Sequence, residues 1–202
     1  MIKIRIGESN LHSSIIFEGG FGAFRREGFP GFDEITGADD TGTALNVVQT
    51  GKRTIIIKNA FFYTSFPTSY REKILIKKRR ASHLIKIWSK CLNLLLKGKL
   101  LLPKSIAIPN IFLHLFNPLI YVLTALISPI ILFKYYLLII PLVTFLLIPF
   151  SRDYFIEFSV NNLILFSAII DVILGKQFIT WEISKNAREL DYHKYLTKNN
   201  LI

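Results

Sequence analysis

The hydrophobic positions of this chain repeat differently in three successive regions. In residues 1–70, short isoleucine-rich runs alternate with polar residues and end at Gly, Asn or Ser. This alternation predicts strands, because successive side chains of a strand point to opposite faces. We expect strands at residues 2–6, 14–17 and 53–58, with a short helix at 41–50 between the last two. The first region is therefore predicted to be an α/β fragment.

The helical period begins at residue 71. Apolar residues three and four positions apart form one stripe: Ala81, Leu84, Ile85, Trp88, Leu92 and Leu95. The opposite side is mostly cationic: Arg79, His83, Lys86, Lys90, Asn93 and Lys97. An apolar stripe that includes tryptophan, opposite a cationic face, is typical of a helix lying at a membrane surface. The alternative is a surface helix whose stripe packs against a protein core.

Three apolar segments follow, at residues 111–133, 135–150 and 155–174. The first has 23 residues without Asp, Glu, Lys or Arg, and a bilayer core about 30 Å thick needs about 20 such residues. The second is short and contains two prolines, and the third contains Glu157 and Asp171. We therefore expect two or three transmembrane helices.

Charge divides the chain in the same way and predicts its topology. The 202 residues carry a formal net charge of +11, although 51% of them are hydrophobic. Lysine and arginine concentrate in residues 71–104, and such loops stay in the cytoplasm. The sequence thus predicts a multi-pass protein of the cell membrane with residues 1–104 cytoplasmic. The basic tail also favours the cytoplasm, which conflicts with three full crossings.

These features divide the chain into four parts. Residues 1–70 form the α/β fragment, and 71–104 form the basic amphipathic helix with its linker. Residues 105–175 form the membrane region, and 176–202 form the basic tail. The one cysteine excludes an intramolecular disulfide, and the scattered histidines lack the spacing of a zinc site.

An ordered series of glycines, acids and cations runs through the first two parts. It consists of Gly20, Gly22 and Arg25, then Asp39 and Asp40, then Gly51, and finally Lys77, Lys78, Arg79 and Arg80. This series resembles the second half of the catalytic domain of family 2 (GT-A type) membrane glycosyltransferases. The tail, with Gly175-Lys176, Trp181 and Arg188, resembles the ending that follows the last membrane segment of many such enzymes.

The resemblance implies a role for each part of the series. Gly20, Gly22 and Arg25 would line the acceptor pocket. Asp40 falls on the aspartate of the family's acidic pair and would be the catalytic base, taking the proton of the acceptor hydroxyl. Asp39 stands where the family usually has glutamate. Arg79 and Arg80 would face the departing nucleotide diphosphate, where negative charge develops.

Two departures limit the expected activity. Lys77 and Ala81 stand where processive members have Gln and Trp, which argues for transfer of one or a few sugars rather than polymer synthesis. The chain also has no Asp-x-Asp motif and too few residues ahead of the series for a nucleotide-binding unit. The sequence therefore predicts a truncated or split glycosyltransferase that is inactive as the lone chain.

The expected partners follow from this interpretation. They are membrane lipids, a donor-binding glycosyltransferase half that brings Mg²⁺ or Mn²⁺, a nucleotide-sugar and a lipid-linked or membrane-proximal acceptor. No cofactor or metal is expected in this chain by itself. The alternative function is a non-catalytic membrane anchor or assembly subunit. A transporter subunit would need charges along the uncharged first span, and a nucleic-acid role does not suit a cationic face organised for a bilayer surface.

Overall fold

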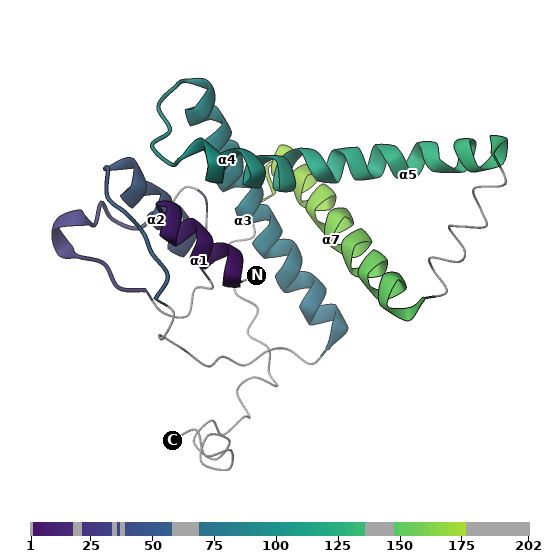
Figure 1. Ribbon diagram of the computed structural model, residues 1–202, viewed down its shortest axis with the longest axis horizontal. Helices are drawn as coiled ribbons and strands as arrows, with labels where there is room; N and C mark the ends of the chain where they lie inside the picture. The colour runs from purple at the N-terminus through teal and green to yellow at the C-terminus, as the bar shows by residue number, and fades with distance from the viewer. Residues whose placement is uncertain are drawn as a thin grey trace, which may run out of the picture. The chain divides into compact units, whose positions relative to one another are not determined.

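The structure is a computed structural model, and it describes residues 2–17, 22–33, 36, 39–57, 69–135 and 148–176. These residues form helices joined by loops (Figure 1). The chain divides into two compact units. Unit 1 comprises Met1–Lys77 and Phe178–Ile202, and unit 2 comprises Lys78–Gln177.

Unit 1 contains helices α1 (Ile2–Leu11) and α2 (Asp39–Gln49) and the short 3₁₀ turn η1 (Arg26–Gly28). The core side of α2 is apolar, and Ala44, Leu45 and Val48 are completely buried. Helix α2 stops where the backbone turns left-handed at Gly51, whose φ is +80°. The Gly51 N–H there donates to the Val48 carbonyl, 2.9 Å away. A glycine is favoured at this position because it has no Cβ to clash.

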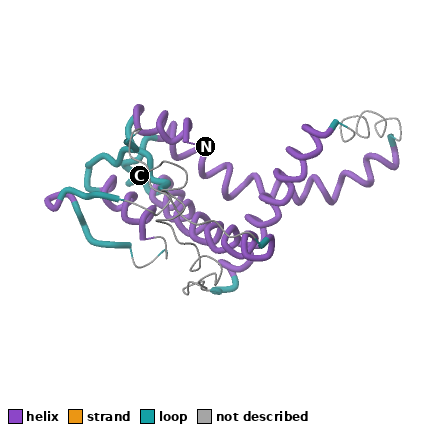
Figure 2. Tube along the Cα trace, turned by 90° about the horizontal axis from the view of Figure 1, so that it is seen from below, coloured by secondary structure: helices purple, strands orange, loops and turns teal. Residues whose placement is uncertain are grey.

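The predicted α/β class is wrong, because no strand occurs among the residues that the structure describes (Figure 2). The alternating run at residues 2–6 lies instead in helix α1. An ion pair one turn apart supports this helix, with Arg5 Nη1 2.7 Å from Glu8 Oε1. The Ser9 hydroxyl also donates to the Arg5 carbonyl across one turn. A strand needs partner strands elsewhere in the chain to be stable, whereas these bonds act within one turn of the helix.

Serine and threonine hydroxyls explain why the other two predicted strands do not form a ladder. Ser13 and Ser14 lie beside Thr54, and the Ser14 N–H donates to the Thr54 carbonyl at 3.0 Å. However, the Thr54 N–H donates to Ser13 Oγ, and Thr54 Oγ1 donates to the Ser14 carbonyl. Side chains thus take backbone groups that a strand ladder would use.

Unit 2 is built around the second part of helix α3 (Tyr70–Leu96). Ala81 and Ile85 of its apolar stripe form a core with Ala168 of helix α7 (Pro149–Ile173). The partly buried residues packed on this core are Leu115, Ile164, Leu165, Ile169 and Val172. Part of the stripe therefore packs against protein, as in the alternative interpretation of this helix. The position of α3 at a membrane surface stays a prediction.

Two helices of unit 2 are long and apolar enough to cross a membrane. The first runs from Lys104 to Lys134. An apolar stretch of 18 residues within it has a mean hydropathy of 2.0, and 6% of that stretch is buried. The second is α7, with a mean hydropathy of 1.7 and 22% buried. The predicted apolar segment at 135–150 lies outside the described residues, apart from its ends. The large exposed apolar surface of both helices fits a lipid environment better than water.

The first of these helices changes its winding in the middle. It comprises α4 (Lys104–Ile111), the π-helical turn η2 (Phe112–Phe116) and α5 (Asn117–Lys134). Pro118 explains the change, because its ring would collide with the carbonyl four residues earlier in a regular α-helix. The wider turn puts the Asn117 N–H on the carbonyl of Phe112, five residues back. Such single π turns often mark functional sites.

Helices α5 and α7 meet at one end and spread apart toward the other (Figure 1). Asn117 Nδ2 donates to Asn162 Oδ1 at 2.7 Å, and one turn further on Tyr121 packs edge-on against Phe158. From the first contact to the second, the residue number rises along α5 and falls along α7. The two helices therefore form an antiparallel hairpin.

Candidate functional site

Asp40, the predicted base, lies in the first turn of α2. Its side chain is half-buried, and Oδ1 accepts a 2.6 Å hydrogen bond from the N–H of Thr41. The sequence predicted a helix at residues 41–50, and α2 begins slightly earlier, at the acidic pair. Asp40 thus lies at the positive end of the helix dipole.

Asp33 is a second carboxylate near the start of α2, and sequence reasoning assigned it no role. It is 5% exposed. Oδ2 accepts hydrogen bonds from the N–H and the hydroxyl of Thr36, and the Asp33 N–H donates to Thr43 Oγ1. A Cβ on Gly42 would lie only 2.7 Å from Asp33 Cβ and Cγ. Asp33 therefore connects the preceding loop to α2. The feature of the sequence that could have indicated this role is the Asp-x-x-Thr spacing, followed by a glycine within the helix.

Of the residues predicted to line an acceptor pocket, the structure describes Gly22 and Arg25. Gly20 lies outside the described residues. Gly22 and Arg25 are exposed, and the Arg25 carbonyl accepts the Gly28 N–H at 3.0 Å. Within the described parts of unit 1, no ion pair joins Arg25 to Asp40.

A hollow in unit 1 is lined by Ser9, Asn10, Arg53, Ile55 and Ile56. Its polar groups are largely taken by the chain itself. The Arg53 guanidinium donates to the carbonyls of His12 and Ser9, at 2.7 and 2.8 Å. Ser9 Oγ accepts the Ile56 N–H. Among the described residues that line the hollow, Arg53 and Ser9 therefore direct their bonds to the chain rather than to a ligand.

Arg79 and Arg80 lie on α3 within unit 2. Arg80 is exposed and Arg79 is half-buried. The preceding Lys78 forms an ion pair with Asp171 of α7, with Nζ 2.6 Å from Oδ2. The sequence gives no sign of this ion pair, because the two residues lie about ninety positions apart and form no local pattern.

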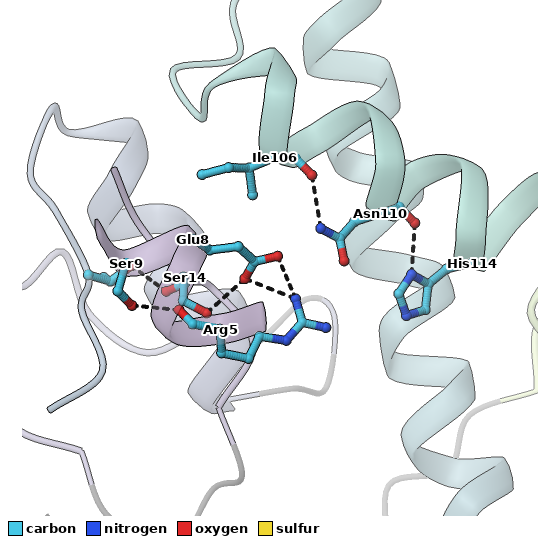
Figure 3. A network of polar contacts seen from close by, with 8 residues as sticks. Arg5, Glu8, Ser9, Ser14, Ile106, Asn110 and His114 are labelled. Atoms are coloured by element: carbon cyan, nitrogen blue, oxygen red, sulfur yellow. Dashed lines mark hydrogen bonds and ion pairs between the residues drawn. The ribbon is translucent and has the colours of Figure 1, made fainter. Parts of the chain in front are cut away.

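Polar contacts within the first long apolar helix hold His114 in place (Figure 3). His114 of η2 is buried, donates through Nδ1 to the Asn110 carbonyl at 2.7 Å, and stacks on Trp88 at 5.8 Å. Asn110 Nδ2 in turn donates to the Ile106 carbonyl. Figure 3 also shows the separate group in unit 1, where Ser14 Oγ donates to Glu8.

Cys91 lies three residues beyond Trp88 and is completely buried. Burial raises the pKa of the Cys91 thiol to about 12, and the charge of neighbouring Lys90 offsets this only in part. The thiol is therefore protonated and unreactive at neutral pH. These properties suit a structural residue rather than a nucleophile.

Among the described residues, no three His, Cys, Asp or Glu side chains gather as a metal site requires. The donor set for Mg²⁺ or Mn²⁺ is therefore not found in this part of the chain. Comparison with protein-family models, with curated proteins and with solved structures finds no match to this chain.

Proposed function

We propose that this chain is the acceptor-side, membrane-bound part of a glycosyltransferase that resembles family 2. The observation that carries the proposal is helix α2, which begins at the Asp39-Asp40 pair and ends before Gly51. The order of features along the chain adds support. A long basic helix follows, and then two helices suited to a membrane.

Each proposed site residue has a chemical task in this reaction. Asp40 takes the proton of the acceptor hydroxyl as its oxygen attacks the sugar. Arg79 and Arg80 supply fixed positive charge to the departing diphosphate. A separate donor-binding partner would hold the nucleotide-sugar with Mg²⁺ or Mn²⁺, and the metal would supply Lewis acidity there.

The membrane part is proposed to be a two-span hairpin with both ends in the cytoplasm. The end of the hairpin next to α3 carries many cations, including Lys99, Lys104 and Lys176, while the other end has Lys134, Arg152 and Asp153. Excess lysine and arginine keeps the first end inside. Two crossings return the chain to the side from which it entered, so the basic tail no longer conflicts with the basic helix.

The test of the activity compares Asp40→Asn with Glu27→Gln, an exposed acid in η1. The chain is purified from its native membranes together with its donor-binding part, and sugar transfer from labelled nucleotide-sugars to extractable lipid is measured. Asp40→Asn should lower the rate about 10²–10⁴-fold. Glu27→Gln should leave it unchanged. Asparagine caps a helix about as well as aspartate, so the fold should survive.

Two results would contradict the proposal. Full transfer by the Asp40→Asn complex would make this carboxylate structural only. Transfer by the isolated chain would show that no separate donor-binding part is needed.

A second candidate function is a non-catalytic membrane anchor or assembly subunit. The finding that favours it is the lack of any strand among the described residues, since the resemblance implied an α/β scaffold. An anchor would bring its partner to the membrane equally well in the parent chain and in the Asp40→Asn variant. If neither form of the complex transfers sugar, the anchor function is the one to retain.

A further inference from the structure

Asp171 occupies a position where a carboxylate needs cations. It lies in the last turn of α7 and is 4% exposed. The C-terminal end of a helix carries partial negative charge, which repels a carboxylate, and burial adds a further cost. Two lysines compensate for both, with Lys78 Nζ 2.6 Å from Oδ2 and Lys176 Nζ 3.1 Å from Oδ1. These three residues are called the Asp171 clamp.

The backbone at the end of α7 brings Lys176 to the clamp. Gly175 has a φ of +70°. Its N–H donates to the Val172 carbonyl, and the Lys176 N–H donates to the Asp171 carbonyl at 2.9 Å. This is the Schellman arrangement, which reverses the chain at a helix end. The Gly-Lys pair of the tail, which the sequence showed only as a resemblance, thus has a physical task here.

The clamp adjoins the apolar contact between α3 and α7. Ala81 and Ile85 follow Lys78 on α3, and Ala168 lies one turn before Asp171 on α7. All five side chains belong to unit 2. Small residues let the two helices approach closely but allow them to slide, whereas an ion pair of defined geometry fixes their register.

We propose that Asp171 is a positioning residue that fixes the register of α3 against the C-terminal end of α7. Arg79 and Arg80 follow Lys78 directly, so the clamp holds both at a set height relative to α7. Without the carboxylate, Lys78 and Lys176 repel each other and α3 loosens. Only the task of the two arginines rests on the proposed function.

The test measures whether α3 stays docked in the full chain. Ala81→Cys is introduced into a Cys91→Ser background, and its labelling by a water-soluble maleimide is followed in native membranes. Asp171→Asn keeps the shape but removes the charge, and it should raise the labelling rate at least about 10-fold, since breaking a buried ion pair is costly. Asp171→Glu should restore a rate within about threefold of the parent, which a role in shape alone would not predict.

Lys176→Gln tests the weaker of the two pairs in the clamp, because the Lys176 side chain is 60% exposed and that of Lys78 is 31% exposed. Exposed pairs contribute little, so labelling should rise by less than about threefold. Lys78→Gln should resemble Asp171→Asn, and it serves if the latter variant does not accumulate. Parental labelling rates in both of these variants would overturn the proposal. Labelling changes without any sugar transfer by the parent complex would refute the proposed function and leave the positioning role standing.

Discussion

Replacing Trp88 by alanine should loosen the second half of α3 from the rest of unit 2. Trp88 is completely buried and stacks on His114 of η2. Truncating a buried tryptophan to alanine typically costs about 3–5 kcal/mol, which combines lost burial with the cavity left behind. Because about 1.4 kcal/mol corresponds to a tenfold change in an equilibrium constant, the population of open α3 should rise by more than about 10²-fold.

Cys91 provides the assay without any added label. Its thiol is buried, and burial raises its pKa to about 12, so it should react with a maleimide only when α3 opens. The alkylation rate of the full chain in membranes should therefore rise with the open population. Leu96→Ala is the control, because Leu96 lies on the same helix and is 79% exposed. Its rate should stay within about threefold of the parent. Equal rates in the two variants would show that α3 is not docked through Trp88.

Three further predictions concern other parts of the chain. Between about pH 9, the ordinary pKa of a thiol, and the raised value of about 12, the folded state keeps the Cys91 proton that the unfolded state loses. The folded state should therefore keep its full stability below pH 9 and lose stability as the pH rises above that value. Cys91→Ala removes the thiol, so the denaturation midpoint of this variant should fall less than that of the parent between about pH 8 and about pH 10.5. Gly42→Ala should destabilise the protein by about 1–3 kcal/mol in urea denaturation, because its Cβ meets Asp33, whereas Gly7→Ala on α1 meets nothing and should not destabilise it. Asn162→Leu removes the bond to Asn117 and should lower the thermal midpoint of the detergent-solubilised chain only slightly, since hydrogen bonds between membrane helices average about 0.6 kcal/mol.

Local signals predicted the helices better than the strands. Helix α2 carries an acidic pair at its start and a glycine after its end, and both act through neighbouring backbone groups. The stripe of α3 likewise has a period that only a helix satisfies. Strands depend on a partner elsewhere in the chain, and the hydroxyls of Ser13 and Thr54 take up the backbone groups where two predicted strands lie side by side.

Contacts between distant residues limited what the sequence could show of the candidate site. Asp33 acts through Gly42 and Thr43 of α2, and Asp171 acts through Lys78. The Asp-x-x-Thr spacing indicates the contact of Asp33 with Thr36 but not its contacts with α2, and Asp171 shares no local pattern with Lys78. The acidic pair was identified because its two residues are adjacent and a glycine follows at a fixed distance.

The central claim is that α5 and α7 form a membrane hairpin whose two ends lie in the cytoplasm, and cysteine labelling tests it most directly. Single cysteines replace Lys99, Lys134, Arg152 and Lys176, each exposed in the structure, in a Cys91→Ser background. A membrane-impermeant maleimide is applied to intact cells and then to permeabilised cells. Cysteines at positions 134 and 152 should react in intact cells, and those at positions 99 and 176 only after permeabilisation. Labelling of position 176 from outside, or protection of position 134, would contradict the hairpin.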